Sequence, residues 1–385
     1  MKKSPIAIEL FAGCGGISTG LLDAGIRVVA GFDHNRSAIE AFKYNHVYRR
    51  TTGHVADLSK ATGQQLAELF GGQPLDLIVG GPPCQPFSII GKQKGLDDHR
   101  GNLVFDFIRL VGDLRPTAVV FENVPNLEKI EDGAIVTRLC EEFARLDYSV
   151  AYAVLNAADY GVPQFRRRLF IVGVRGKQAI AFPPPVTHKA SDELDLFCTL
   201  PKHRTCRDAI DDLPDVTTPE SWEIPNHEAT MHSPAMLEAF AHLKPGTREK
   251  KSFHDRLHPD RPSYTLRAGT GNFSPLRPVH YKYDRVISVR ESARIQSFSD
   301  TFIWPDPIPR LQQYRQVGNA VPPLLAAAIG QAIAKTLGWH LTPGDHLGDP
   351  SSRPPAMTTT PEFRFAERQR RTRGASLGRG VSEAA

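Results

Sequence analysis

The sequence predicts an α/β protein built on a Rossmann-like, doubly wound sheet, with a small irregular domain inserted in its second half. Two observations carry this prediction. The chain opens with an apolar strand at residues 6–10, a glycine-rich turn and an amphipathic helix at residues 17–24, the order in which such folds begin. Short apolar runs at residues 75–79, 118–121 and 169–174 follow, with helical patterns between them, as buried strands of an α/β sheet do.

The composition is that of a soluble globular protein. The chain has 385 residues, of which 41% are hydrophobic and 23% charged, enough for one large domain or two modest ones. It contains no run of about eighteen apolar residues, and its first five residues lead into the first strand without the apolar region of a signal peptide. We therefore expect a cytoplasmic protein with no membrane partner.

The cysteines and the net charge narrow the possible functions only slightly. Five cysteines, an odd number with no Cys-x-x-Cys pair, argue against a disulfide framework or a zinc site, and we expect no metal. The formal net charge of +5 permits nucleic-acid binding without demonstrating it. The cysteines are Cys14, Cys84, Cys140, Cys198 and Cys206.

The first turn and the next strand predict a cofactor site. The turn Phe11-Ala12-Gly13-Cys14-Gly15-Gly16 follows a strand, and its glycines allow the backbone to approach a ligand closely, although the pattern is not Gly-x-Gly-x-x-Gly. About twenty residues later a second strand, residues 28–32, ends in Asp33, whose carboxylate can accept hydrogen bonds from both hydroxyls of a ribose. Together they indicate a ribose-containing ligand.

We expect the centre of the functional site in the stretch Gly80-Gly81-Pro82-Pro83-Cys84-Gln85-Pro86-Phe87-Ser88. Its prolines forbid a continued strand or an immediate helix, so Cys84 is predicted to lie on a stiff loop at the carboxyl end of a strand. A lone cysteine is more often a small buried hydrophobe than a nucleophile. The proline setting instead favours a thiol held at a fixed distance from a substrate.

A carboxyl group is predicted at the same sheet edge. An apolar strand at residues 118–121 runs directly into Glu122-Asn123-Val124, and Pro125 ends it. Apolar surroundings should raise the pKa of Glu122 and make it a proton donor. An acid that ends a strand is often only a helix cap, but its position beside the Cys84 loop favours a chemical role.

A basic cluster, Gln164-Phe165-Arg166-Arg167-Arg168, precedes the strand at residues 169–174. Alternate residues of an extended segment share a face, so Gln164, Arg166 and Arg168 are expected to point the same way. Arginines in such clusters usually pair with surface carboxylates, and only the neighbouring motifs indicate another role.

The character of the sequence changes at residues 182–185, where three prolines follow a phenylalanine. We expect a first domain at 1–182 that carries the predicted catalytic and cofactor-binding residues, an irregular domain at 183–260, a further segment at 261–339 and a disordered tail at 340–385. The histidines of 183–260 lack metal-ligand spacing. Basic residues there that could contact phosphates are Arg204, Arg207, Lys244, Arg248, Lys250 and Lys251.

The sequence predicts the starts of two helices in the segment at 261–339. Ser288-Val289-Arg290-Glu291 is a Ser-x-x-Glu capping box. Gln316-Val317-Gly318-Asn319-Ala320-Val321-Pro322-Pro323 places a turn and two prolines before an apolar helix that reaches about residue 337.

Together these motifs resemble those of the DNA cytosine carbon-5 methyltransferases of bacterial type, from about residue 6 to about residue 328. The resemblance implies that the cofactor is S-adenosylmethionine and that 183–260 is the target-recognition domain. It also implies that the segment at 261–339 returns to complete the catalytic domain and its cofactor pocket. His34 would lie flat against the adenine, and Asp57 matches the acid that binds it, although a solvated turn aspartate is the alternative. The implied cofactor-binding residues are Phe11, Ala12, Gly13, Gly15, Gly16, Asp33, His34, Asp57, Leu58, Asn319 and Val321.

The resemblance also implies a reaction. A thiolate of Cys84 adds to carbon 6 of cytosine, Glu122 protonates ring nitrogen 3, and carbon 5 becomes nucleophilic enough to accept a methyl group. The base must be flipped out of the duplex. Arg168 would hold the cytosine carbonyl oxygen, and Arg166 would serve phosphate binding or loop orientation. The substrate-binding residues implied are Pro83, Gln85, Ser88 and Gln164.

The predicted partner is double-stranded DNA, bound by a monomer that modifies a specific sequence. A cognate restriction endonuclease acting on the same site fits the compact chain, and a solitary methylase fits it equally. Three rival readings stay open from the sequence: an RNA cytosine methyltransferase with the same motifs, a catalytically silent DNA-binding homologue, and a redox or metal-binding cysteine protein. Intact Cys84, Glu122 and Arg168 count against the second, and the cysteine spacing against the third.

Overall fold

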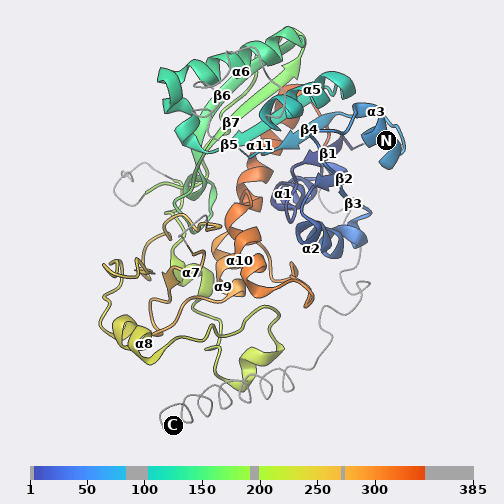
Figure 1. The fold of residues 1–385 in the computed structure, drawn as a ribbon. Helices are drawn as coiled ribbons and strands as arrows, with labels where there is room; N and C mark the ends of the chain where they lie inside the picture. Colours follow the sequence, from blue (N-terminus) through green and yellow to red (C-terminus); the bar gives the residue numbers. More distant parts are fainter. Residues whose placement is uncertain (1–3, 84–102, 191–198, 270–273, 343–385) are drawn as a thin grey trace.

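A seven-stranded sheet forms the centre of the protein (Figure 1), in a computed structural model that describes residues 4–83, 103–190, 199–269 and 274–342. The strand order is β3-β2-β1-β4-β5-β7-β6. The first five strands in this order are parallel, and β7 runs antiparallel between β5 and β6. The α/β class expected from the sequence is confirmed. The strands are β1 Ile6–Leu10, β2 Arg27–Asp33, β3 Thr52–Val55, β4 Leu77–Gly80, β5 Ala118–Asn123, β6 Tyr148–Asn156 and β7 Arg167–Arg175.

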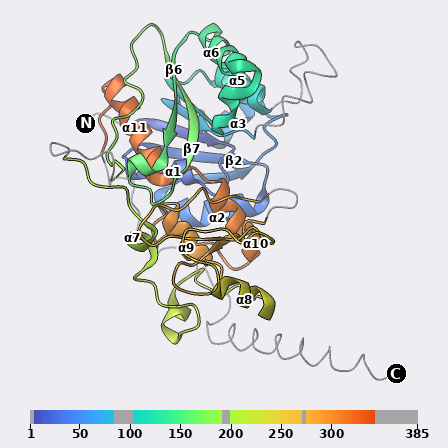
Figure 2. The same cartoon turned by 90° about the vertical axis from the view of Figure 1, so that its left-hand side faces the viewer.

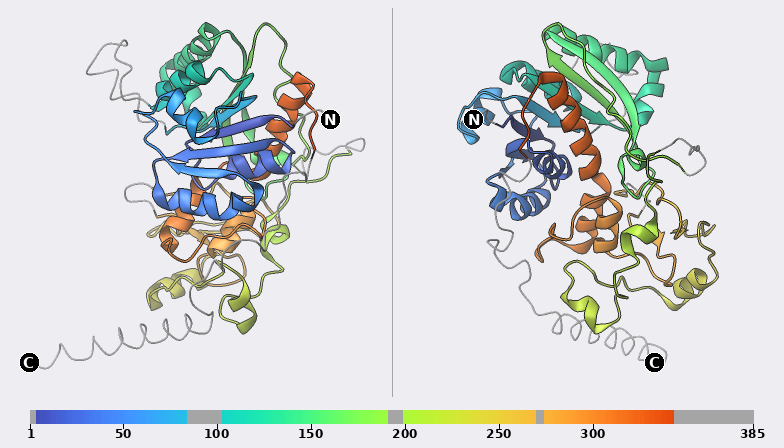
Figure 3. Two further views of the ribbon diagram at one scale, coloured as in Figure 1. Left: turned by 90° about the vertical axis from the view of Figure 1, so that its right-hand side faces the viewer. Right: turned by 180° about the vertical axis from the view of Figure 1, so that it is seen from behind.

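Helices cover both faces of this sheet, and each face has its own apolar core. One core joins the sheet to α3 (Gly63–Leu69), α5 (Leu103–Leu114) and α6 (Ala134–Arg145). The other joins it to α1 (Gly16–Asp23) and α11 (Pro323–Leu337). The view from behind in Figure 3 shows α11 running beside α1. Helix α2 (Arg36–His46) packs on β2 and β3.

Helices α1 and α11 approach each other so closely that only small residues fit between them. A Cβ atom at Gly20 would lie 2.2 Å from the carbonyl oxygen of Pro323, and one at Gly16 would lie 2.3 Å from that of Val321. The last helix therefore returns to the first turn of the chain, as the resemblance of the motifs implied. Residues 310–337 are long and apolar enough to span a membrane by composition, but 67% of their apolar window is buried within the fold.

A second, less regular region lies below the sheet in Figure 1 and extends from it in Figure 2. Its small β8–β9 sheet pairs one strand from before residue 260 with one from after it, in parallel. The two segments on either side of that residue are thus interleaved. The elements are α7 Cys206–Ile210, η4 Pro219–Glu223, α8 Pro234–Ala241, β8 Asp255–Arg256, β9 Pro278–Val279, α9 Val289–Ile295 and α10 Arg310–Asn319.

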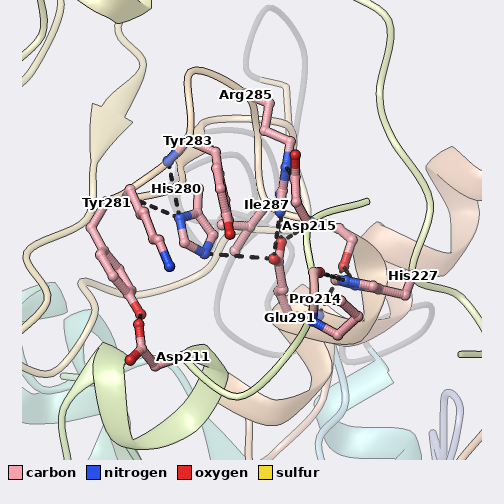
Figure 4. Close-up of polar contacts among 12 residues, drawn as sticks. Asp211, Pro214, Asp215, His227, His280, Tyr281, Tyr283, Arg285, Ile287 and Glu291 are labelled. Atoms are coloured by element: carbon pink, nitrogen blue, oxygen red, sulfur yellow. Dashed lines mark hydrogen bonds and ion pairs between the residues drawn. The ribbon is translucent and has the colours of Figure 1, made fainter. Parts of the chain in front are cut away.

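A buried ionic cluster holds this region together (Figure 4). Arg285 donates hydrogen bonds of 2.9 Å to both carboxylate oxygens of Glu291 and one of 2.9 Å to Asp215. Glu291 is 1% exposed; burial alone would raise its pKa, but the Arg285 guanidinium lowers that pKa to about 2. Glu291 also completes the predicted capping box with Ser288, whose hydroxyl contacts His227 at 2.8 Å. The cluster therefore ties residues before 230 to the start of α9.

Candidate active site

A carboxyl–guanidinium pair lies at the carboxyl edge of the sheet. Glu122 is near the end of β5, and Arg168 is near the start of the antiparallel neighbour β7. Arg168 Nε lies 3.0 Å from Glu122 Oε1, and the two side chains are only 14% and 13% exposed. The antiparallel pairing of β5 with β7 brings them together, because the start of one strand lies beside the end of the other.

Burial raises the pKa of Glu122 above its ordinary value, and the charges of Arg168 and Arg166 oppose that rise only in part. The neutral acid therefore persists to higher pH than in water, which is the condition for a general acid. Arg168 also donates a hydrogen bond of 2.7 Å to the carbonyl oxygen of Arg167, which limits where its guanidinium can point.

The backbone that leads to Cys84 lies against this pair. A Cβ atom at Gly81 would meet Glu122 Oε2 at 2.5 Å, so the carboxyl group occupies the space that a side chain at 81 would need. Asn123 donates a hydrogen bond of 3.0 Å to the carbonyl oxygen of Pro82 and so fixes the residue that follows Gly81. Pro83 is exposed. Three residues predicted for the site lie outside the described part of the chain: Cys84, Gln85 and Ser88.

Gln164 and Arg166 are fully buried and cross-link the sheet to the returning segment. Gln164 donates to Gln296 and accepts a hydrogen bond of 2.9 Å from the backbone of Leu266. Arg166 donates to the carbonyl oxygens of Leu266 at 3.0 Å and Gly318 at 2.8 Å. The alternation expected from the sequence is present, since the intervening Phe165 and Arg167 are exposed. This burial favours loop orientation over phosphate contact for Arg166.

A pocket of about 330 Å³ opens beside the pair. Arg168 lines it, and the exposed residues Phe165 and Arg167 form part of its mouth. The remaining lining residues are Pro125, Asn156 and Thr265. The pocket therefore lies between the ends of β5 and β6, the start of β7 and the segment at 261–339.

The glycine turn and Asp33 meet at the same sheet edge. Gly13 has a φ of 54°, and its N–H donates a hydrogen bond of 2.9 Å to Asp33 Oδ2. The other carboxylate oxygen accepts one of 2.8 Å from Asn35. A Cβ atom at Gly13 would meet nothing within 4 Å, so the turn borders open space where a ligand can approach the backbone. Each Asp33 oxygen keeps acceptor capacity for ribose hydroxyls.

The other predicted cofactor residues surround this turn. Ala12 donates to the carbonyl oxygen of Phe32, Phe11 has a φ of 56°, and Gly15 has a φ of 93° before α1 begins at Gly16. Val321, two residues before α11 begins, contacts Gly16, and Asn319 is exposed at the end of α10.

Three predicted residues lie around the ends of β2 and β3. His34 is 75% exposed, with its Nδ1 3.3 Å from Asp33 Oδ1. The carbonyl of Asp33 accepts a hydrogen bond of 2.9 Å from Ala56, next to Asp57. Asp57 is exposed, and hydrogen bonds with Ser59 and Lys60 lower its pKa to about 2, so it is an anionic acceptor. Leu58 is buried in the core.

Two positioning residues were not predicted from the sequence. Asn123 holds the loop before Cys84, and its neighbour Glu122 in the Glu-Asn-Val triplet was the available signal. Gln296, at the end of α9, accepts from Gln164 and donates to the carbonyl of Ala320, and nothing local in the sequence indicates these contacts.

Among the described residues, no group of three or more His, Cys, Asp or Glu side chains could hold a metal ion.

The doubly wound sheet carries a glycine turn facing Asp33 and a buried acid–arginine pair on one edge, the arrangement of an α/β enzyme that binds a ribose-containing cofactor. Residues 6–335 match the family described as C-5 cytosine-specific DNA methylase, and the chain belongs to this family of enzymes. It is 35% identical over 381 residues to the type II methyltransferase M.XorII of Xanthomonas oryzae pv. oryzae, covering 86% of this chain and 85% of that protein. It is 34% identical to the type II methyltransferase M1.HphI of Haemophilus parahaemolyticus, covering 85% and 86%.

Solved structures agree with the assignment. A DNA modification methyltransferase encoded within an E. coli prophage is 28% identical and superposes with a TM-score of 0.69, covering 87% of this chain and all of that one. The S. pombe Dnmt2 methyltransferase superposes with a TM-score of 0.62 at 16% identity, covering 87% and 100%, which shows a shared fold. The family match over residues 6–335 confirms the family expected from the sequence motifs.

Proposed function

We propose that the protein transfers a methyl group from S-adenosylmethionine to carbon 5 of a flipped-out cytosine within a specific sequence of double-stranded DNA. The observation that carries this proposal is the buried Glu122–Arg168 pair, packed against Gly81. Cys84 follows Gly81 by three residues, and chain connectivity limits the span to about 11 Å. This limit supports the assignment of Cys84, Glu122 and Arg168 to one site.

The reaction needs both a nucleophile and an acid. Carbon 5 of cytosine is a weak nucleophile, so Cys84 adds to carbon 6 and the ring electrons move to nitrogen 3, where Glu122 delivers its proton. Burial, which raises the pKa of Glu122, keeps that proton available. Arg168 is placed to hold the cytosine carbonyl oxygen while it orients the Glu122 carboxyl group. After methyl transfer, loss of the carbon-5 proton lets Cys84 leave.

The target base must leave the stacked duplex to reach this site, because carbon 6 is inaccessible within it. The pocket lined by Arg168, Phe165 and Thr265 is where the flipped base would enter. Pro83, Gln85 and Ser88, on the Cys84 loop, are proposed to contact the substrate. Gln164 acts from its buried position by holding the backbone of Leu266.

The residues around the glycine turn fit S-adenosylmethionine, which supplies the electrophilic methyl group. Asp33 has acceptor capacity for the ribose hydroxyls, Gly13 opens the backbone to the ligand, and Asp57 presents a carboxylate to the adenine amino group. His34 would flank the adenine ring. The return of α11 against α1 places Val321 at the same turn.

The type II names of the relatives support a role as a modification enzyme that protects a site from a cognate endonuclease, inside the cell. A solitary methylase is the alternative. We propose that the irregular region at 183–260 reads the DNA sequence and that the protein acts as a monomer in the cytoplasm. Its exposed basic residues suit a phosphate backbone.

The test is methyl transfer from radiolabelled S-adenosylmethionine to DNA and, in parallel, to total RNA. We expect label in DNA alone, and bisulfite sequencing of DNA from expressing cells should map it to cytosines in one short sequence. Label in RNA alone would replace DNA with RNA as the substrate. A folded protein that labels neither polymer would refute the proposal.

A further inference from the structure

A second pocket of about 330 Å³ adjoins the one beside the Glu122–Arg168 pair. The two pockets share Phe165 and Thr265 as lining residues, so they meet at a common wall. The second pocket is strongly basic, because three arginines line it against a single carboxylate. Its other lining residues are Arg248, Asp255, Tyr264, Arg267, Ser274, Pro275, Arg277 and Pro278.

Two of these arginines are already engaged within the protein. Arg248 makes two hydrogen bonds to the carboxylate of Asp255, at 2.6 and 3.1 Å, and so neutralises the pocket's acid. The guanidinium of Arg277 lies over the ring of Phe253, 5.7 Å from its centroid. Arg267 differs: its side chain is exposed, and within the described residues no hydrogen bond or ion pair involves it.

The backbone that carries Arg267 is held firmly. Leu266, immediately before it, accepts a hydrogen bond from buried Arg166 and donates one to buried Gln164. On the other side, a Cβ atom at Gly318 would lie 2.6 Å from the carbonyl carbon of Arg267, so these backbones touch. Arg267, which has no ionic partner among the residues of the described ranges, is thus presented from a backbone fixed to Gln164 and Arg166, and this reduces the entropy lost when it binds an anion.

We propose that Arg267 binds a backbone phosphate of the DNA strand that carries the flipped cytosine, next to the target nucleotide. The shared wall means that a strand whose base enters the first pocket passes the mouth of the second. A phosphate there meets a pocket whose one carboxylate among the described lining residues is neutralised by Arg248, and it gives Arg267 a partner that the described part of the chain does not supply. The inference rests on the proposed function, because it requires a flipped target base.

The test is the salt dependence of DNA affinity for wild type and Arg267→Gln. Each phosphate contact contributes about 0.9 to the slope of log affinity against log salt. The ratio of wild-type to variant affinity should therefore shrink about 3.5-fold between roughly 50 and 200 mM salt. Affinity is measured on a labelled duplex of about 30 base pairs that contains the mapped site, with S-adenosylhomocysteine bound, and on an unrelated duplex.

Two controls separate this role from a structural one. Arg267→Lys keeps the charge and should keep most of the slope. Arg145→Gln removes a surface arginine of α6 that pairs with Glu142 and should leave the slope unchanged. A wild-type slope in Arg267→Gln would overturn the inference. If the sequence preference were relaxed at the same time, Arg267 would contact a base and not a phosphate. Wild-type enzyme that neither binds nor methylates DNA would instead refute the proposed function.

Discussion

The surroundings of one side chain, Glu122, change the pKa and fix the orientation of its carboxyl group. A free glutamate at neutral pH is an anion and a poor acid. Here burial raises its pKa, while Arg168 at 3.0 Å both limits that rise and orients the carboxyl group. The contact with Gly81 then places the acid against the chain that leads to Cys84.

Replacing this acid tests its role directly. Glu122→Gln keeps an acceptor for Arg168 but has no proton to donate, so DNA and cofactor binding should stay near wild type. Single-turnover methyl transfer should slow by roughly 10²- to 10⁴-fold. The matched control is Glu142→Gln, which removes an arginine-paired glutamate on the surface of α6 and should leave the rate unchanged. An unaltered rate in Glu122→Gln would remove this residue from the mechanism.

At the scale of elements, β1 supplies the N-terminal cap of α1. The residue before the helix is Gly15, which has no side chain to cap it. Glu9 of β1 instead accepts a hydrogen bond of 2.8 Å from the backbone N–H of Ser18 and another from its hydroxyl. The carboxyl group therefore satisfies a donor of the first helical turn from the neighbouring strand and fixes the glycine turn between them.

This cap makes stability depend on pH. Burial raises the pKa of Glu9 from its ordinary 4.5 to about 8, although the Ser18 hydrogen bonds oppose it. The folded protein therefore holds a proton that the unfolded chain releases, and this stabilisation is complete below about pH 4.5 and lost as the pH rises through about 8. Between these values the free energy of unfolding should fall by up to about 1.4 kcal/mol per pH unit from this group.

Glu9→Gln, which cannot ionise, should lack this component. Urea unfolding at several pH values in that window measures it, with the wild-type profile falling more steeply towards pH 8 than the variant's. Parallel profiles for two folded proteins would show that Glu9 does not retain a proton. The comparison of slopes is insensitive to a uniform change in stability caused by the substitution itself.

At the scale of the whole molecule, we propose that residues at the sheet edge carry out the reaction and that the irregular region recognises the DNA sequence. Exchanging residues 187–260 for the equivalent segment of a relative with a different target should move methylation to the relative's site. Asp215, His227 and Arg256 should be retained, because each contacts the returning segment from within the exchanged part. Bisulfite sequencing reads the outcome, and an unchanged site in an active chimaera would place recognition elsewhere.

The sequence could predict features that local patterns determine, and it could not predict contacts between distant segments. The strand at Ile6–Leu10, the glycine turn and the Ser288–Glu291 capping box follow from local patterns, and the structure contains each of them. The hydrogen bond between Gln164 and Leu266 joins segments about one hundred residues apart, and no local pattern encodes it. The lack of a partner for Arg267 within the described part of the chain likewise depends on how distant segments pack. Elements of the irregular region are short and held by buried ion pairs, so hydrophobic periodicity could not reveal them.

Covalent trapping is the measurement that tests the central claim, that Cys84 is the nucleophile. A duplex with 5-fluorocytosine at the mapped target should accept the methyl group and then stall, because fluorine cannot leave as a cation. Wild-type enzyme should give an enzyme–DNA adduct that survives denaturation and requires S-adenosylmethionine. Cys84→Ser should give none, since a hydroxyl is a far poorer nucleophile than a thiolate, whereas Cys140→Ser, on α6, should give the wild-type amount. A cofactor-dependent adduct persisting in Cys84→Ser, or none in active wild-type enzyme, would contradict the account.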